Sequence, residues 1–240
     1  MPTFDKQDLL NRLHHQLIVS CQPDSLDREH DPMNHPLIMA ALAQAAALGG
    51  AAGIRADSPA DIRAIRQVVS LPIIGIYKHD LQGFDVRITP MLEDALLVAE
   101  AGADAIAVDA TNRPRAQGLS AGEYIRQVQK ASGLPIFADI ATFEEGIAAA
   151  EAGADAVLTT LAGYTHGQTE PDEPDFNLIS KLAAKLNVPV IAEGHINTPE
   201  QAARALAEGA WAVTVGSAIT RPRFITQKFI AGIRHWQDLV

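Results

Sequence analysis

Two ionisable side chains stand directly after short apolar runs and could move protons on a substrate. Lys78 follows PIIGIY, and Glu193 follows PVIA. Burying a carboxylate without a partner is costly, which disfavours a purely structural role for Glu193, whereas Lys78 could still be a solvated loop lysine. An amine and a carboxylate that face one cavity could exchange protons with a carbon on opposite faces of a substrate. We therefore interpret Lys78 and Glu193 as candidate catalytic groups.

Two glycine turns after apolar runs have the character of phosphate-binding sites. Gly194 follows Glu193, and Gly216 with Ser217 follows WAVTV, each just before a predicted helix. Backbone N–H groups at a helix start attract anions, and glycine lets a phosphate oxygen approach the main chain. Arg221 comes one short helical turn later and could reach back towards such a phosphate. The alternative is a surface helix arginine, because RPRFITQKF carries other cations.

Further polar residues end the other apolar runs. They are Gln22, Arg55, Asp109, Asp139, Thr159 and Thr160. Any one of them could be an ordinary cap whose side chain satisfies the start of a helix. If the runs are strands of one barrel, however, all their ends meet at one mouth, and Arg55 should point into it. A convergence of Arg, Lys, Asp and Glu is harder to explain as capping.

Several familiar catalytic motifs are missing from the chain. The eight histidines show neither HExxH nor HxH spacing, so we expect no metal site. The sequence also lacks a GxSxG elbow, a P-loop and a CxxC motif. His195, beside Glu193, could still touch a ligand.

The apolar runs and the segments between them indicate eight repeated βα units. Short, β-branched runs bounded by glycine predict strands buried on both faces. These strands are expected within 17–21, 51–55, 71–78, 100–110, 134–140, 151–160, 188–194 and 208–217. Helical segments are expected near 34–48, 58–69, 90–101, 120–132, 142–152, 176–187 and 198–208.

This order of elements predicts an α/β protein with a (β/α)8 TIM-barrel fold. A doubly wound open sheet is the alternative, but the chain lacks GxGxxG after its first strand, and such a sheet would rarely need eight regular strands. We expect a single domain over 1–240, with an N-terminal helix in 1–16 that caps the barrel bottom and the barrel over 17–234. The polar loops 23–36 and 163–174 both follow strands, so they are candidate substrate lids.

Composition limits the classes of binding partner and the cellular compartment that are expected for the protein. Lys plus Arg is 19 against 29 acidic residues, a net charge of −10, which disfavours a general nucleic-acid or anionic-membrane surface. The single cysteine, Cys21, ends the apolar run LIVSC and is expected to be a buried core residue in a reducing compartment. No run approaches the ~20 apolar residues that span a bilayer, and no secretory leader is evident. We expect a cytoplasmic protein.

The strand ends together carry a family resemblance. The motifs IVSCQ, GGAAGIRA, LPIIGIYK, TTLAGYT, AEGHINTP and VGSAITRP occur in order between about residues 17 and 230. In this they resemble the bacterial N-acetylmannosamine-6-phosphate 2-epimerases. The resemblance implies a cofactor-independent isomerase of amino-sugar and sialic-acid catabolism, whose substrate is a phosphorylated N-acetylated amino sugar and whose product is N-acetylglucosamine 6-phosphate.

The same resemblance implies roles for particular residues. It makes Lys78 and Glu193 the catalytic pair and makes Gln22, Arg55 and Asp139 substrate contacts. It assigns the 6-phosphate to Gly194, Gly216, Ser217 and Arg221. The chain departs from the expected pattern at Ser217, where some relatives have glycine, at His195, where others have arginine, and at Tyr77, an aromatic residue expected to narrow the cavity.

The chemistry implied by the resemblance sets a difficulty for the lysine. Epimerisation at C2 needs the open-chain sugar, in which an aldehyde receives the charge as an enolate. A lysine with its ordinary pKa of about 10.4 is protonated at neutral pH, and a neighbouring carboxylate favours the ammonium further. Burial or Arg55 would have to oppose this effect. The alternatives are a Schiff-base aldolase that uses Lys78 and a non-catalytic phosphosugar-binding protein.

The oligomeric state is less constrained. Alanine-rich outer helices could pack internally or against another subunit. We expect a homo-oligomer, with a dimer preferred.

Overall fold

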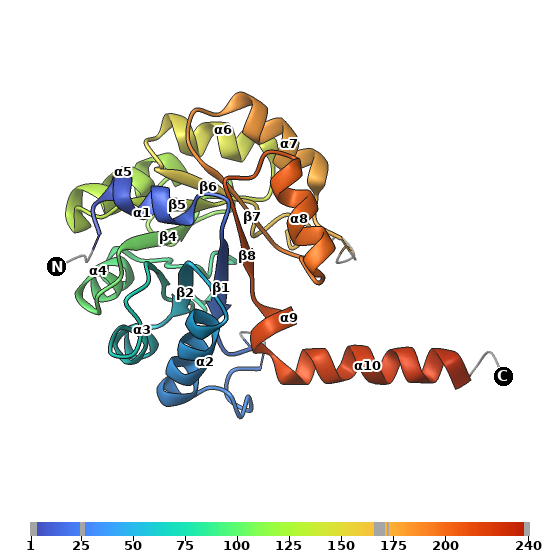
Figure 1. Ribbon diagram of the computed structural model, residues 1–240. Coiled ribbons are helices and arrows are strands. Elements are labelled where there is room, and N and C mark those ends of the chain that lie inside the picture. The colour runs from blue at the N-terminus through green and yellow to red at the C-terminus, as the bar shows by residue number, and fades with distance from the viewer. Residues whose placement is uncertain (1–3, 25–26, 166–170, 172, 238–240) are drawn as a thin grey trace.

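The chain folds as a closed barrel of eight parallel strands surrounded by helices, as the computed structural model of Figure 1 shows. The structure describes residues 4–24, 27–165, 171 and 173–237. Each strand pairs with the next along the chain, and β8 closes the sheet by pairing with β1, with Leu17 opposite Val213. The predicted TIM barrel is therefore confirmed.

The elements alternate regularly. The strands are β1 Leu17–Cys21, β2 Gly53–Asp57, β3 Ile73–Ile76, β4 Ala105–Asp109, β5 Ile136–Asp139, β6 Ala156–Leu158, β7 Val190–Glu193 and β8 Ala212–Val215. The helices are α1 Lys6–Leu13, α2 Pro36–Leu48, α3 Pro59–Arg66, α4 Leu92–Glu100, α5 Ala121–Ser132, α6 Phe143–Glu151, α7 Phe176–Lys185, α8 Pro199–Ala207, α9 Ser217–Thr220 and α10 Pro222–Gln237. None of these helices is long and apolar enough to cross a membrane.

Side-chain alternation along the strands divides the core into an inner and an outer part. Inward residues such as Ile74, Ile76 and Phe137 fill the barrel, whereas their neighbours pack against the surrounding helices. The outer contact is tight at Gly75, where an added Cβ would lie 2.4 Å from Cγ1 of Val98 on α4. Because Lys78 is two residues beyond Ile76, the same alternation directs it to the inside of the mouth.

Local sequence signals explain where several helices begin. Ser120, Thr142 and Thr198 each accept a hydrogen bond from the backbone N–H three residues later, and the side chain at that third position bonds back to the cap. Such reciprocal capping boxes satisfy N–H groups that a helix leaves without partners. These caps fix the residues at which α5, α6 and α8 begin.

The N-terminal helix α1 closes the bottom of the barrel, as expected. Leu9, Leu10 and Leu13 are buried and pack with the apolar side chains of the barrel interior. Trp211, just before β8, donates from Nε1 to the carbonyl of Leu10 at 2.9 Å. The helix also binds Asp155 through Lys6, with 3.0 Å between Nζ and Oδ1.

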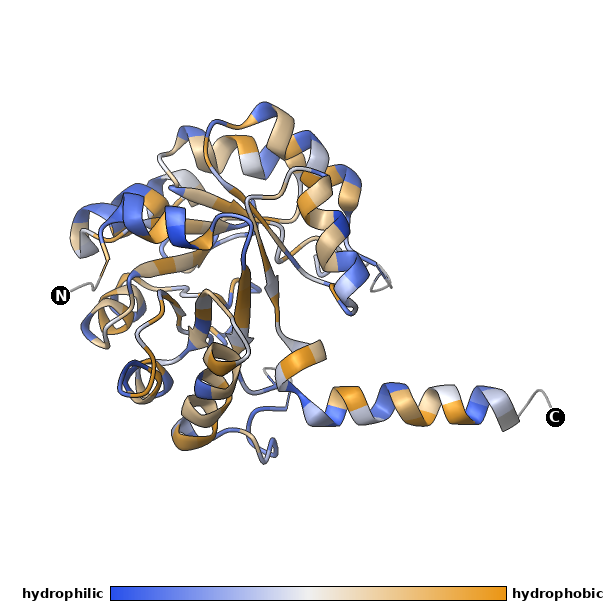
Figure 2. Cartoon of the chain, in the orientation of Figure 1, coloured by the Kyte–Doolittle hydropathy of each residue, from blue (hydrophilic) through white to orange (hydrophobic). Residues whose placement is uncertain are grey.

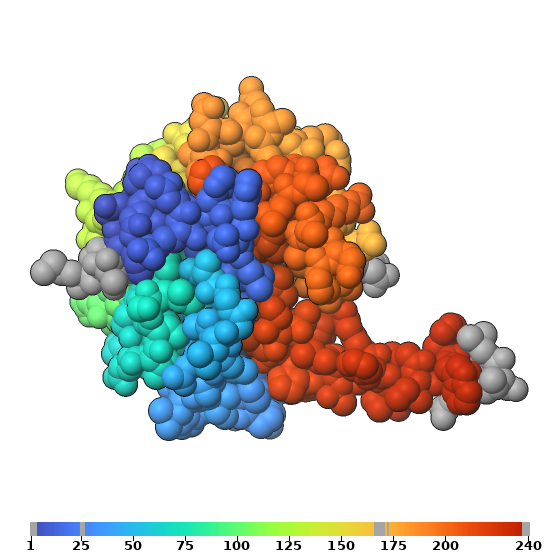
Figure 3. All heavy atoms as spheres, viewed as in Figure 1, coloured from blue at the N-terminus to red at the C-terminus, as the bar shows by residue number. Residues whose placement is uncertain are grey.

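The C-terminal helix α10 departs from the compact arrangement. It leaves α9 and extends away from the barrel instead of packing against it (Figure 1). None of the residues from Pro222 to Trp236 is buried. In the cartoon coloured by hydropathy, polar and apolar residues alternate along this helix (Figure 2), and in the space-filling view it forms a separate arm (Figure 3).

Candidate active site

The carboxyl ends of the strands place polar side chains on the inner face of one mouth. In TIM barrels this is the face that carries the active site. The sequence-predicted residues that reach it are Gln22, Arg55, Lys78, Asp109, Asp139, Thr160, Glu193 and the Gly216 turn. Although these residues span almost the whole chain, the closed barrel brings their strand ends together. The predicted convergence of the strand ends is confirmed.

A buried arginine organises one side of this mouth. Arg55 binds Asp139 through two parallel hydrogen bonds of 2.9 and 2.7 Å, and both side chains are fully buried. Its Nη1 also donates to Oε2 of Glu193 at 2.6 Å and to the hydroxyl of Thr160 at 3.3 Å. Arg55 therefore points into the mouth as expected, and its two Nη atoms bind protein carboxylates.

Glu193 is held from two directions. Its backbone N–H donates to the hydroxyl of Thr159 at 3.1 Å, and that hydroxyl donates to the Glu193 carbonyl at 2.9 Å. The Glu193 side chain is 13 % exposed at the mouth. Burial raises the pKa of Glu193 above its ordinary value, and the nearby Asp139 adds to this, while Arg55 and Lys78 oppose it. Glu193 is thus more readily protonated than a solvated glutamate, which suits proton transfer.

The Lys78 amine lies on the inner face of the mouth and has a neutral hydrogen-bond partner. Its Nζ donates to Oε1 of Gln22 at 2.8 Å. Burial lowers the pKa of Lys78 to about 8, with Arg55 and Arg221 acting in the same direction and Asp57 and Glu193 opposing. The expectation that burial and Arg55 must counteract the carboxylates agrees with this balance. A neutral amine is accessible near physiological pH.

One charged group in the mouth was not predicted. Asp57, the last residue of β2, is fully buried, and its Oδ1 accepts the backbone N–H of Lys78 at 2.8 Å. Its Oδ2 forms an ion pair with Arg28 from the loop after β1. Two-residue alternation from Arg55 places Asp57 on the same inner face, and this signal could have identified it. The predicted strand 51–55 ended two residues too early to include it.

The residues assigned to the phosphate lie around two neighbouring strand ends. Gly194 follows β7 with φ +100°, a conformation that favours glycine, and an added Cβ would lie 3.3 Å from the Thr160 carbonyl. Gly216 is the N-cap of α9, and Ser217 is the first residue of that helix. Arg221 ends the same turn and donates to the carbonyl of Pro23 at 3.2 Å. The turns after β7 and β8 with a short extra helix are a recurrent phosphate site of barrels.

Some of the strand-end residues have the structural role of the alternative interpretation. Asp109 accepts hydrogen bonds from Thr111 and Arg113 and lies 3.6 Å from Arg115, all in the loop that follows β4. The hydroxyl of Thr159 hydrogen-bonds to the backbone of Glu193, as described above. Cys21 is fully buried, as expected, and burial raises the pKa of its thiol to about 12.

Two residues near the catalytic pair, Tyr77 and His195, contact neighbouring side chains and main chain, and a ligand contact of His195 stays a prediction. Tyr77 packs with the outer core and makes an edge contact with His79, with 5.2 Å between ring centroids. The expectation that it narrows the cavity is wrong, because strand alternation turns residue 77 outward when Lys78 points inward. His195 stacks on Tyr164, with 4.3 Å between ring centroids, and its Nε2 lies 3.1 Å from the Ala162 carbonyl oxygen.

The two candidate lids remain predictions. Residues 25–26, within the 23–36 loop, and 166–170 and 172, within the 163–174 loop, lie outside the described residues. In the described part of the first loop, Arg28 contacts the site through Asp57, and Asp27 forms an ion pair with Arg223 at 2.9 Å.

Within the described ranges, no group of three or more His, Cys, Asp or Glu side chains is placed to hold a metal ion.

Several known proteins similar to this chain are described as epimerases of one sugar phosphate. The family model described as "Putative N-acetylmannosamine-6-phosphate epimerase" matches residues 39–235. A relative from Caldanaerobacter subterraneus subsp. tengcongensis, named "Putative N-acetylmannosamine-6-phosphate 2-epimerase", is 46% identical over 230 residues, which cover 95% of each chain. A relative of the same name from Edwardsiella ictaluri is 49% identical over 218 residues, covering 91% of this chain and 89% of that one.

A solved structure is also similar over nearly the whole chain. It is that of the N-acetylmannosamine-6-phosphate 2-epimerase from Clostridium perfringens. The TM-score is 0.87 at 40% sequence identity, and the match covers 92% of this chain and 95% of the other. The similarity in sequence and in structure therefore extends over the same strand ends that build the mouth.

Proposed function

The chain belongs to the N-acetylmannosamine-6-phosphate epimerase family, and on this premise we propose that it interconverts N-acetylmannosamine 6-phosphate and N-acetylglucosamine 6-phosphate. The observation that carries the proposal is that Lys78 and Glu193, partly buried at the ends of β3 and β7, lie close enough for their charges to interact and have pKa values shifted by burial. The enzyme is then an isomerase of amino-sugar and sialic-acid catabolism. A Schiff-base aldolase and a non-catalytic binding protein are not favoured by the comparisons.

The reaction is a proton exchange at C2 of the open-chain sugar. In the direction of N-acetylglucosamine 6-phosphate, the neutral amine of Lys78 removes the C2 proton, the C1 aldehyde takes up the charge as an enolate, and protonated Glu193 returns a proton on the opposite face. The reverse reaction begins from the Lys78 ammonium and the Glu193 carboxylate. Both starting forms hold one proton on the pair, so the pair titrates as a unit.

The surrounding residues hold this pair in place. Arg55 and Asp139 are proposed to contact the substrate, and the ion pairs from Arg55 to Asp139 and to Glu193 also support a role in placing Glu193. Gln22 is bonded to the Lys78 amine and is proposed to share its contacts with the sugar. Side chains held in this way need little rearrangement when substrate binds, which favours catalysis.

The 6-phosphate is proposed to bind at the adjoining turns after β7 and β8. Gly194 and Gly216 expose main chain there, and Ser217 offers the first backbone N–H of α9. Arg221 follows immediately and would supply the positive charge. Phosphate held at this edge would place the sugar carbons across the mouth, towards Lys78 and Glu193. No metal or other cofactor takes part in the proposed chemistry.

The activity is tested by following N-acetylmannosamine 6-phosphate by proton NMR with and without the protein. Conversion to N-acetylglucosamine 6-phosphate is expected. Binding without turnover would support the phosphosugar-binding alternative, and borohydride trapping of a sugar on Lys78 would support the aldolase.

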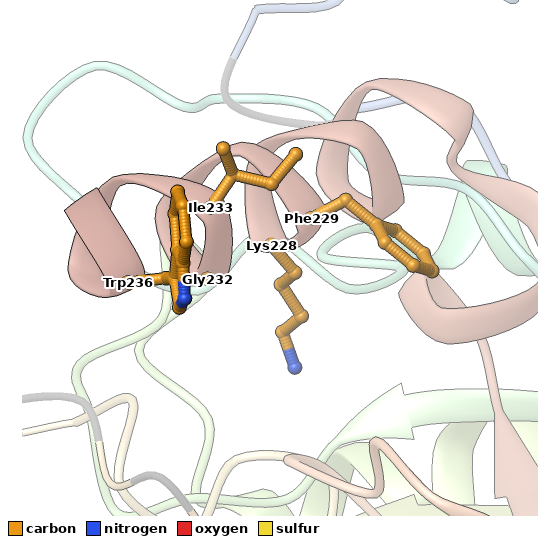
Figure 4. Close-up of a pocket in the computed structure, with 5 residues that line it drawn as sticks. All are labelled: Lys228, Phe229, Gly232, Ile233 and Trp236. Carbon is orange, nitrogen blue, oxygen red and sulfur yellow. The ribbon is translucent and has the colours of Figure 1, made fainter. Parts of the chain in front are cut away.

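We further propose that the enzyme is a homodimer joined through α10. Phe229, Ile233 and Trp236 on this helix are 71%, 54% and 61% exposed. With Lys228 and Gly232 they line an apolar recess beside the helix, as Figure 4 shows. A 16-residue helix with no buried side chain among Pro222 to Trp236 gains little from the barrel, and large exposed apolar patches mark interaction sites. A second copy of the chain is the occupant we propose.

Light scattering after gel filtration tests this assembly. The wild-type protein is expected to elute as a dimer, and Phe229→Asp with Trp236→Asp is expected to give a monomer. A monomeric wild-type protein would refute the proposed dimer.

We also propose a cytoplasmic location, which the unpaired, buried Cys21 supports.

A further inference from the structure

Asp57 is a buried charge that the proton exchange does not use. Its side chain has no exposed surface, and it stands two residues after Arg55 on the inner face of β2. Its Oδ1 accepts the backbone N–H of Lys78 at 2.8 Å. A buried carboxylate is costly unless it is paired and hydrogen-bonded, and at this position it acts on the main chain that carries the catalytic amine.

The charge partner of Asp57 comes from a different segment. Arg28, in the loop between β1 and α2, forms an ion pair with Oδ2 of Asp57. The loop around Arg28 is held locally, because its carbonyl accepts a hydrogen bond from Nδ2 of Asn34 at 3.0 Å. One carboxylate therefore links the backbone of the catalytic lysine to a cation of the loop.

We propose that Asp57 and Arg28 form a positioning pair for Lys78, in which Asp57 fixes the lysine backbone and Arg28 offsets the charge that Asp57 imposes on the lysine amine. The inference rests on the proposed function where it concerns turnover. Neither side chain is proposed to touch the substrate. Both act through Lys78.

The charges around the amine show why the offset matters. Those that act on Lys78 are Asp57 and Arg55 from β2, Glu193 from β7 and Arg221 after α9. Those that act on Asp57 are Arg28, Lys78 and Arg55, and Asp61 of α3 lies close enough to interact with it. Asp57 is the strongest of the charges that raise the pKa of Lys78. Without Arg28, less of the negative charge of Asp57 would be compensated, and the remaining charge would favour the Lys78 ammonium.

The pair therefore sets how much neutral lysine is available. An opposite charge nearby favours the charged form of a titrating group by one unit or more. Arg28→Gln is expected to raise the pKa of Lys78 by about one unit, and Asp57→Asn is expected to lower it by a similar amount. The pKa of Lys78 in the double variant is expected to be close to that in the wild type, because the two charges removed are opposite in sign.

The decisive measurement is an NMR titration of the lysine side chains labelled with ¹³C at Cε. The chain has six lysines, and Lys78→Met assigns the signal of interest. Arg28→Lys keeps the charge and is expected to keep the wild-type titration. Arg223→Gln is the matched control, because it removes an equal charge that pairs with Asp27 of the same loop and makes no contact with Asp57. It is expected to leave the Lys78 signal unchanged.

The inference is overturned if Arg28→Gln leaves the titration of Lys78 where it was, or if Arg28→Gln and Asp57→Asn move it in the same direction. Arg28 is partly exposed, so its variants test the inference even if Asp57→Asn does not fold. The titration needs no substrate. Opposite shifts in a protein that does not epimerise would support the pair and refute the proposed function, whereas the basic limb of kcat/KM should follow the shifts in an active enzyme.

Discussion

Removing the buried guanidinium of Arg55 is expected to destabilise the protein strongly and in a pH-dependent way. Arg55→Leu leaves the carboxylates of Asp139 and Glu193 without the cation that now binds them at 2.7 and 2.6 Å. Removing one partner of a buried ion pair costs about 3–5 kcal/mol. At about 2–4 °C per kcal/mol for a chain of this size, the thermal midpoint should fall by roughly 6–20 °C at pH 7.5.

The pH dependence has a defined sign. Folding already raises the pKa of Glu193 because of burial, and loss of Arg55 raises it further. A carboxyl group with a raised folded-state pKa destabilises the protein above its unfolded pKa, and stability is regained as the pH falls through the folded value. The difference in thermal midpoint between Arg55→Leu and the wild type should therefore become smaller as the pH falls from 7.5 to 5.

Differential scanning calorimetry across this pH range measures the effect. Arg12→Leu is the matched control, because it breaks an exposed ion pair with Asp8 and should cost no more than about 1 kcal/mol. Arg55→Leu combined with Asp139→Leu should recover part of the loss. The reasoning is refuted if Arg55→Leu behaves like Arg12→Leu, or if its deficit does not change with pH.

Three further expectations follow from the site. The basic limb of kcat/KM should have a pKa of about 8, because loss of the shared proton is governed by Lys78; a limb above pH 9.5 would contradict the effect of burial. Arg221→Ala should raise KM for the phosphorylated sugar by about 10- to 100-fold with a smaller change in kcat, because it removes a charged hydrogen bond to the phosphate. An unchanged KM in steady-state kinetics would show that the phosphate does not bind Arg221. Cys21 should react with a thiol reagent only after unfolding, because burial raises its pKa to about 12; rapid labelling of the native enzyme would show that the core around β1 opens.

The fold could be predicted because its signals are local and repeated. The strand β1 matches the predicted 17–21, and the other strands lie within or close to the predicted runs, because short apolar segments bounded by glycine recur with helical segments between them. Lys78 and Glu193 could be identified as strand-end residues for the same reason. Their partners could not, since the bond from Arg55 to Asp139 joins residues 84 positions apart.

What was missed depended on contacts between distant segments. Arg28 lies in a polar loop and acquires its role only through Asp57, 29 residues later. Helix α10 has an amphipathic sequence that would also suit a helix packed on the barrel, so its extension away from the barrel has no local signal. The exposed apolar residues on which the proposed dimer is based lie on α10.

The central claim is that Lys78 and Glu193 exchange protons at C2, and turnover in deuterium oxide tests it most directly. Proton NMR should show loss of the C2 proton signal as the wild-type enzyme converts N-acetylmannosamine 6-phosphate. Lys78→Met and Glu193→Gln, each shown to be folded by circular dichroism, should each lose conversion by at least about 100-fold, because each removes one of the two groups that transfer protons. A folded variant of either kind that epimerises the sugar at the wild-type rate would contradict the account.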